Sequence, residues 1–135
     1  MLDLDDREAC AWLVLQTLRS DAEFRRVVEV ARHAHGAVEL AALCAQLNAY
    51  TAEATLTYRF MDDELLHRVV VSSPHEPYLA LGILLSGPFG VHAVQCCGFC
   101  EGYFLRTSRH GQRHCRDSCR ARSSQRRLVH EAVSA

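Results

Sequence analysis

The sequence contains no lysine, so all 15 of its basic residues are arginine. It contains no uninterrupted run of 18 apolar residues, and no transmembrane helix is therefore expected. The acidic N-terminus, MLDLDDREAC, lacks the basic segment that begins a secretory signal peptide. A Walker loop, a G-x-S-x-G, an H-E-x-x-H and the zinc-deaminase signature are also missing. These absences predict a cytoplasmic protein that binds no membrane and is not an enzyme.

The 135 residues are 49% apolar and 23% charged, which is typical of one small globular unit with or without a metal-bound appendix. The charge is distributed unevenly along the chain. Residues 1–105 contain 7 Arg against 14 acidic residues, whereas residues 106–127 contain 8 Arg against one Asp. A dense arginine block after an acidic segment indicates a surface that binds a polyanion. A solvated basic helix that pairs with the acidic body is the alternative interpretation.

Three helices are expected in the first 50 residues, because apolar residues recur there every three or four positions. The first covers 5–20 and is capped by Asp5 or Asp6, the second runs from Asp21 to a terminating Gly36, and the third covers 37–49. The expected core positions are Cys10, Ala11, Trp12, Leu15 and Leu18 in the first helix, Phe24, Val27, Val28 and Ala31 in the second, and Leu40, Leu43, Cys44 and Leu47 in the third.

The periodicity changes after residue 50. Residues 55–60 and 66–71 are rich in β-branched and aromatic side chains, and the polar segment MDDEL lies between them. This pattern predicts a β-hairpin, which we expect to pack on the helices because an isolated hairpin is only marginally stable. Residues 77–86 predict a further short helix. The glycines and proline of 87–90 then mark a hinge between a domain at 1–90 and a second unit at 94–131.

Five of the seven cysteines lie within residues 96–119. Because the N-terminus lacks an export signal, this cluster indicates metal ligands rather than a disulfide framework. Cys97 and Cys100 form C-x2-C, Cys115 and Cys119 form C-x3-C, and 14 residues separate the two pairs. A C-x2-C turn places two sulfurs on one side of a knuckle, and residues i and i+4 place two more on adjacent turns at a helix N-terminus.

The spacing therefore predicts a Zn²⁺ site with four thiolate ligands, built from a hairpin and a helix as in a treble-clef finger. A complete set of four thiolates leaves no position for a reactive water, which favours a structural role. Two alternatives remain open at this point. Cys96 could be the metal ligand in place of Cys97, and His110 or His114 could be a ligand in place of one of the sulfurs. The overall class expected is α+β, with a mostly helical first domain and a small zinc finger ending in a basic helix.

The cysteine segment resembles the CGNR-type zinc-finger family. The resemblance is carried by Cys100, Phe104, Thr107 and Ser108, then Arg109, Gly111 and Arg113, and finally Cys115 and Cys119. The tetrad that names the family reads Cys119-Arg120-Ala121-Arg122 here. The preceding body, including the Leu47–Asn48 pair and the hairpin, is similar to the ABATE domain of that family. The resemblance implies a bacterial regulator whose body binds a ligand or a protein partner and whose finger binds DNA.

The arginines suggest how such a finger would act. A helix starting near Cys115 places Arg116, Arg120 and Arg127 along one stripe and Arg122 and Arg126 on a second. Arg106, Arg109 and Arg113 extend the basic surface onto the preceding loop, and Ser123, Ser124 and Gln125 are candidates for reading bases. The favoured hypothesis is a DNA-binding transcriptional regulator. The alternative is a protein-interaction module whose basic finger docks on an acidic protein surface.

Overall fold

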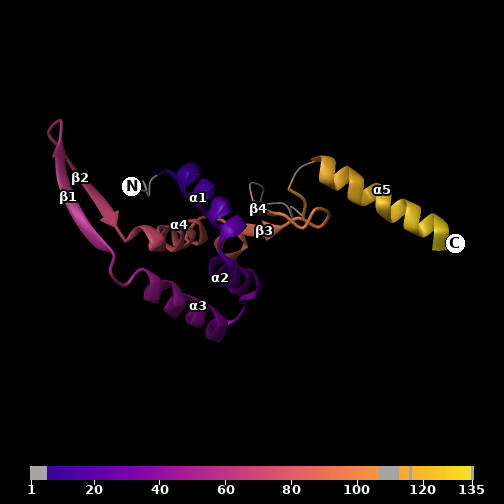
Figure 1. Ribbon diagram of the computed structural model, residues 1–135, viewed down its shortest axis with the longest axis horizontal. Coiled ribbons are helices and arrows are strands. Elements are labelled where there is room, and N and C mark those ends of the chain that lie inside the picture. The colour runs from indigo at the N-terminus through magenta and orange to yellow at the C-terminus, as the bar shows by residue number, and fades with distance from the viewer. Residues whose placement is uncertain (1–5, 107–112, 116, 135) are drawn as a thin grey trace.

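The computed structural model describes residues 6–106, 113–115 and 117–134 (Figure 1). Its elements confirm the α+β class, with a helical body, two separate antiparallel hairpins and a long final helix. In chain order they are α1 Arg7–Ser20, α2 Ala22–His33, α3 Ala37–Tyr50, β1 Thr55–Met61, β2 Glu64–Val70, the 3-10 turn η1 Ser73–His75, α4 Glu76–Leu85, the 3-10 turn η2 Gly90–His92, β3 Val94–Cys96, β4 Tyr103–Leu105 and α5 Asp117–Ser134. No helix among these described residues is both long and apolar enough to cross a membrane.

Two aspartates begin the first two helices, as the sequence predicts. The Asp6 carboxylate accepts a hydrogen bond from the backbone N–H of Ala9 at 3.0 Å, and the Asp21 carboxylate accepts one from Phe24 at 3.1 Å. Each such cap satisfies an N–H group that the helix itself leaves unpaired and stabilises the helix by about 1 kcal/mol. Asp21 also ends α1, so a single residue sets the corner between α1 and α2.

The prediction that Gly36 ends the second helix is wrong. The helix already ends at His33, and Ala34 is extended. Gly36 instead precedes α3 with φ +81°, a left-handed value that glycine adopts at little cost. The glycine therefore serves the reversal of the chain into α3 rather than the closure of α2.

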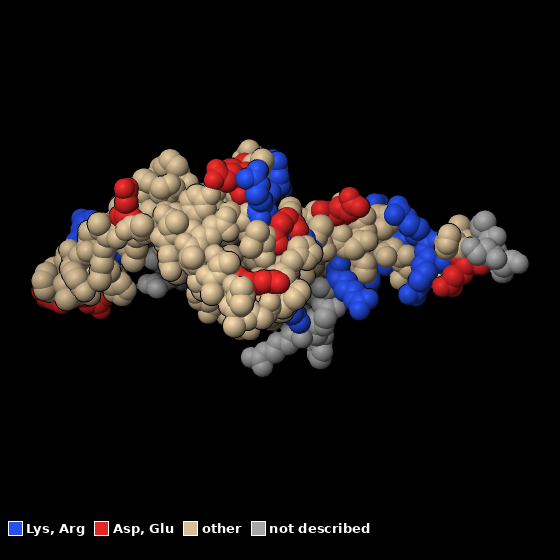
Figure 2. All heavy atoms as spheres, turned by 90° about the horizontal axis from the view of Figure 1, so that it is seen from below, with Lys and Arg blue, Asp and Glu red and all other residues tan. Residues whose placement is uncertain are grey.

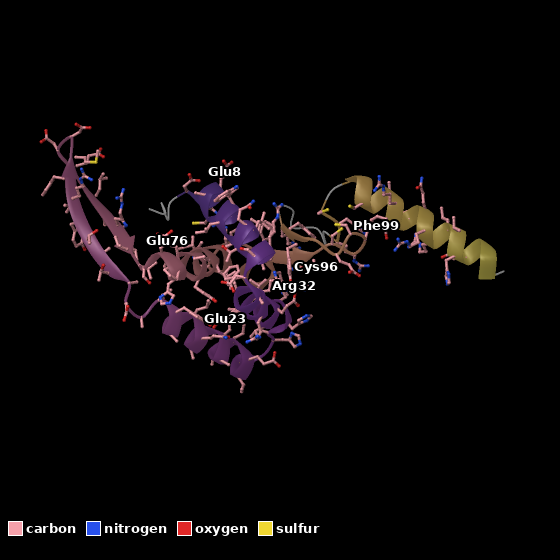
Figure 3. All side chains as sticks on the ribbon, in the orientation of Figure 1. Glu8, Glu23, Arg32, Glu76, Cys96 and Phe99 are labelled. Carbon is pink, nitrogen blue, oxygen red and sulfur yellow. The ribbon has the colours of Figure 1, made fainter. Side chains whose placement is uncertain are left out.

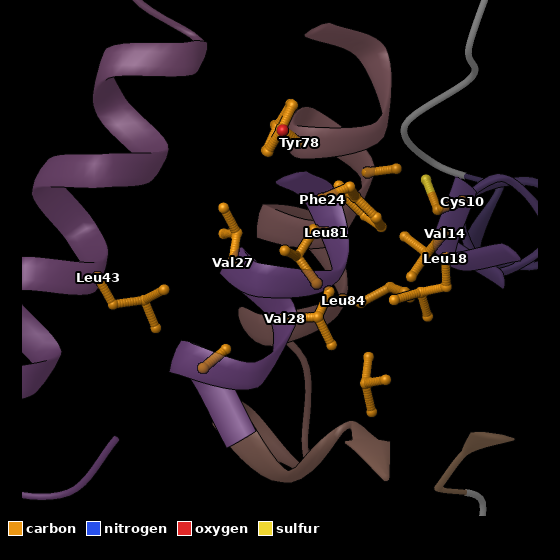
Figure 4. Close-up of a cluster of buried hydrophobic side chains, with 13 residues drawn as sticks. Cys10, Val14, Leu18, Phe24, Val27, Val28, Leu43, Tyr78, Leu81 and Leu84 are labelled. Carbon is orange, nitrogen blue, oxygen red and sulfur yellow. The ribbon is translucent and has the colours of Figure 1, made fainter. Parts of the chain in front are cut away.

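The core of the body lies between α1, α2 and α4, whose buried side chains interdigitate (Figure 4). The predicted buried face of α2 is confirmed, since Phe24, Val27, Val28 and Ala31 are all buried. The predicted face of α1 is partly wrong. Its buried residues are Cys10, Val14 and Leu18, while Trp12 is 64% exposed. Positions two residues apart lie on opposite sides of a helix, so burial of Cys10 turns Trp12 towards solvent.

Helix α3 is less buried than its apolar sequence predicts. Leu43 is buried, whereas Leu40 is 38% exposed and Cys44 is exposed, so the prediction that Cys44 is a core residue is wrong. The reason is that α3 contacts the body along a narrow stripe and stands partly away from α4. Between the two helices lies a mostly apolar groove of about 350 Å³ lined by residues such as Cys44, Leu47 and Ile83, which we call the α3–α4 groove.

The hairpin β1–β2 forms where the sequence predicts it, but with a tighter turn. The strands extend to Met61 and Glu64, and the turn consists of Asp62 and Asp63, with φ values of 52° and 64°. Two left-handed residues are typical of the two-residue turn that matches the twist of a hairpin. The expectation that the hairpin packs on the helices is wrong. Every residue of β1 is exposed, and the hairpin projects from one end of the molecule (Figure 1).

The second hairpin, β3–β4, rests against the body. Val94 belongs to the buried cluster of the body, and the backbone N–H of Arg106 donates to the carbonyl oxygen of Ala93 at 2.8 Å. Strand β4 contacts α1, and β3 contacts α2. The short hairpin thus connects the body to the cysteine-containing segment, and the division of the chain near residues 87–90 stays a prediction.

A pair of aromatic-to-alanine substitutions tests which faces of α1 and α2 are buried. Phe24→Ala removes a fully buried ring that meets Tyr78 edge-on at 5.2 Å, and we expect it to lower the free energy of unfolding by about 3–5 kcal/mol. Trp12→Ala, at an exposed site, is expected to change it by less than about 0.5 kcal/mol. Urea unfolding followed by far-UV circular dichroism measures both. A larger loss for Trp12→Ala would contradict this packing.

Candidate metal centre

Four cysteine sulfurs come together between the β3–β4 hairpin and the start of α5. The Sγ atoms of Cys97, Cys100, Cys115 and Cys119 all lie within 4.8 Å of one another. Two of the separations are 3.7 Å, from Cys100 to Cys115, and 3.6 Å, from Cys115 to Cys119. Four thiolates around a tetrahedral zinc at 2.3 Å would be separated by about 3.8 Å. The donor set and its spacing thus fit a metal ion of this kind.

None of the seven cysteines, all of which lie in the described part of the chain, forms a disulfide. The residues that were alternatives as ligands lie differently. Cys96 points away from the cluster, where its Sγ lies 3.1 Å from the carbonyl oxygen of Glu101. His114 is described and is not a member of the group, while His110 lies outside the described residues.

The first pair of sulfurs is held by a tight knuckle between β3 and β4. The N–H of Cys97 donates to the carbonyl oxygen of Gly102 at 2.8 Å, and the N–H of Glu101 donates to that of Cys97 at 3.1 Å. Glu101 adopts a left-handed φ of 61°, which closes the turn. The N–H of Gly98 donates to the carbonyl oxygen of Arg113 at 2.8 Å. This last bond attaches the knuckle to the segment that carries the second pair.

The second pair spans the start of α5. The helix begins at Asp117, so Cys119 lies in its first turn and Cys115 lies in the segment before it. Only Cys119 is helical, so the prediction that the two cysteines lie on adjacent turns of the helix is wrong.

The surroundings of the cluster shift the pKa values of Cys97 and Cys115 in opposite directions. Burial raises the pKa of Cys97, but the backbone N–H groups of Phe99, Cys100 and Cys115 donate towards its sulfur and bring its pKa down to about 6. The pKa of Cys115 is raised, by burial and then by the neighbouring sulfurs of Cys119 and Cys100. Four close sulfurs do not all ionise without a cation, so metal binding here would release protons.

The cluster has only a very small apolar core of its own. Phe104 is buried beside Cys97 and Cys119, and Phe99 packs against them. So few buried side chains do not offset the conformational entropy of ordering such a segment, and natural folds of this size are stabilised by a metal or by disulfides. The residues present therefore suit a structural ion, which would supply the missing cross-links.

A polar contact that the sequence does not predict ties this region to the body. The Tyr103 hydroxyl on β4 donates to the Glu29 carboxylate on α2 at 2.5 Å, and the Arg32 guanidinium donates to the same carboxylate at 2.7 Å. Burial raises the pKa of Tyr103 to about 12, with the adjacent Glu29 adding to the shift. Burial opposes ionisation of Glu29, but the two donors outweigh it and lower its pKa. Because 74 residues separate the partners, no local sequence signal marks them.

The structure places the predicted nucleic-acid-binding arginines in three settings. Arg106 is half-buried, with its guanidinium 5.3 Å from the centre of the Phe89 ring, and Arg113 is exposed. Four arginines lie exposed along α5 (Figure 2), namely Arg120, Arg122, Arg126 and Arg127. Two others, Arg109 and Arg116, lie outside the described residues, as do Thr107, Ser108 and Gly111 of the family resemblance.

The arginines of α5 divide into two groups by helical position. Arg120 and Arg127 are two turns apart on one side of the helix, and Arg122 and Arg126 are one turn apart on roughly the opposite side. The guanidinium of Arg126 lies 4.7 Å from the centre of the Phe99 ring, which belongs to the cysteine knuckle (Figure 3). This contact helps to fix α5 relative to the knuckle. It leaves Arg120 and Arg127 on the opposite side, away from it.

Serine substitutions test which sulfurs hold a metal. Cys97→Ser removes one of the four clustered sulfurs, and we expect it to reduce the bound zinc well below one equivalent per chain, because metal binding and folding are coupled. The neighbouring Cys96→Ser, whose sulfur points away, is expected to keep a full equivalent. Elemental analysis after gel filtration measures both. Loss of zinc in Cys96→Ser and its retention in Cys97→Ser would show that the ligand set is wrong.

Comparison with known proteins yields no relative for this chain. No family model matches it, and no curated protein or solved structure matches it. The CGNR resemblance therefore rests on the individual residues that carry it. The geometry of the cysteine cluster and of α5 is the remaining guide to function.

Proposed function

We propose that this protein is a bacterial DNA-binding transcriptional regulator in which Zn²⁺ holds together the module that contacts nucleic acid. One observation carries the proposal. The four-sulfur cluster lies at the start of a helix that carries four exposed arginines and no lysine. A rigid base at one end of a cationic helix is the arrangement needed to present that helix to a polyanion.

The four clustered cysteines would hold the zinc, and its role would be to cross-link the knuckle to α5. Four thiolates fill the coordination sphere, so the ion would have no position for a substrate or a reactive water. On this basis we propose that the protein is not an enzyme. The chain's own contribution is the backbone N–H groups around Cys97, which favour the thiolate form before the metal arrives.

The surface of α5 has the charge that phosphate contacts require. In Figure 2 its arginines form a blue band at one end of the molecule, whereas acidic side chains are spread over the body. Arg120 and Arg127 lie about 10 Å apart along the helix axis and project from the side away from Phe99. That spacing allows the two guanidinium groups to contact phosphates of one duplex at the same time. The resemblance to CGNR-type fingers supports the same assignment.

The body would then serve regulation. The α3–α4 groove is the concave site for a small apolar ligand or a partner side chain, because its walls include Leu47 and Ile83 while Asn48 and Thr51 supply polar groups. Such a ligand would act on the finger through the Glu29–Tyr103 contact, which joins α2 to β4.

A matched pair of double variants tests the DNA-binding proposal. Arg120→Ala with Arg127→Ala removes two charges from α5, and Arg59→Ala with Arg68→Ala removes two from the exposed hairpin β1–β2. We measure binding of the full chain to a fluorescent mixed-sequence duplex by anisotropy across a range of NaCl concentrations. For the α5 variant we expect weaker binding and a salt slope reduced by about 1.8, the loss of two phosphate contacts. The hairpin variant is expected to match the wild type.

Other outcomes have definite meanings. Equal weakening of the two variants would indicate a general charge effect, with no special role for α5. Failure of the wild-type, zinc-loaded protein to bind any duplex at low salt would contradict DNA binding. Such a failure would favour the second candidate, in which the basic finger docks on an acidic protein surface.

A further inference from the structure

The charged side chains of the strands β1 and β2 all lie on one side of the hairpin. In the antiparallel register, Leu56 pairs with Val69, Tyr58 with His67, and Phe60 with Leu65. Directly opposed residues share a side of a hairpin, and every second pair lies on the same side. These six residues form what we call the apolar face. The opposite face carries the charged residues Arg59, Arg68 and Glu64 and two threonines, together with Met61, Leu66 and Val70.

Most of the apolar face is exposed, and only Val69 of its six residues is half-buried. Phe60 is 74% exposed, Tyr58 65%, Leu65 57% and Leu56 54%. Together these side chains leave roughly 500 Å² of apolar surface in water, which is as large as the largest patch on a typical monomer. An isolated two-stranded hairpin is marginally stable, and in this one β1 is exposed along its whole length while only Val69 and Val70 of β2 are half-buried. The hairpin therefore needs a partner that covers this side.

We propose that the partner is a second copy of this chain, whose own apolar face packs against the first. Two copies of the apolar face are able to pack together without bringing fixed like charges close, because the only ionisable basic residue on the face is His67. The arginines and Glu64 point to the other side. A two-fold axis through the contact makes the same patch serve both copies, which is the commonest arrangement in homodimers.

Charge also selects the relative direction of the two hairpins. The turn carries three consecutive acidic residues, Asp62, Asp63 and Glu64. A parallel arrangement would place six carboxylates at one end of the contact, and their repulsion disfavours it. In the antiparallel arrangement the two acidic turns lie at opposite ends. The dimer contact is therefore antiparallel, with Tyr58 and His67 near its centre.

The buried area determines how tight this dimer is. Two apolar faces bury roughly 1,000 Å² in total, near the lower limit for a specific protein–protein interface. The dimer is accordingly a weak one that dissociates on dilution. Figure 1 shows the hairpin and α5 at opposite ends of the molecule. The dimer contact therefore does not involve the arginines of α5, and it holds whether or not the protein binds DNA.

Two cross-strand pairs that neighbour each other on the hairpin provide the test. Phe60→Thr with Leu65→Thr removes an apolar pair from the apolar face, and Arg59→Thr with Leu66→Thr alters the next pair on the opposite face. Threonine keeps the preference for strands in both variants. Sedimentation velocity of the full, zinc-loaded chain from 1 to several hundred micromolar measures the oligomeric state, and the circular dichroism melting curve reports whether the body remains folded.

We expect the wild type and Arg59→Thr/Leu66→Thr to dimerise with the same dissociation constant, and Phe60→Thr/Leu65→Thr to raise that constant about tenfold or more. A wild type that stays monomeric at the highest concentration would overturn the proposal and indicate that a different molecule covers the face. Equal dimerisation of all three proteins would place the contact elsewhere. Equal loss in both variants would indicate pairing through the strand edges instead of the apolar face.

Discussion

The convergence of four sulfurs within 4.8 Å is the constraint on which the structure after residue 94 depends. The buried residues of its apolar cluster are Cys97, Phe104 and Cys119, so ordinary hydrophobic packing does not explain its order. Three local features help to bring the four sulfurs together. The knuckle directs Cys97 and Cys100, the bond from Gly98 to Arg113 brings the second pair close, and Arg126 rests on Phe99 to orient α5.

One polar and one apolar contact join this segment to the rest of the molecule. The Tyr103–Glu29 hydrogen bond fixes the β3–β4 hairpin to α2, and Val94 inserts into the core of the body. The body in turn rests on the packing of α1, α2 and α4 and leaves two apolar surfaces open, the α3–α4 groove and the hairpin β1–β2. This arrangement suits the proposed regulator, because the arginines of α5 lie at one end of the molecule and the two apolar surfaces lie elsewhere.

The features that the sequence predicts well are those decided within one turn or one motif. Asp21 caps α2 because its carboxylate needs only an N–H three residues on, and the cysteine pairs come together because their spacing is local to a knuckle and a helix start. The features it misses depend on distant partners. Trp12 is exposed because α4 packs against another side of α1, and the apolar character of Phe60 gives no sign that its hairpin projects from the body. Pattern alone identifies an apolar side chain without identifying the molecule that covers it.

X-ray absorption at the zinc edge, on protein purified without added metal, tests whether the four clustered cysteines hold a zinc ion. We predict one zinc per chain with a first shell of four sulfur atoms at about 2.3 Å and no nitrogen or oxygen neighbour. That result would establish a closed, structural centre at the base of α5. A shell containing a nitrogen or an oxygen atom would mean that a histidine or a water completes the site. Protein without zinc and with two of the clustered cysteines oxidised to a disulfide would contradict the account.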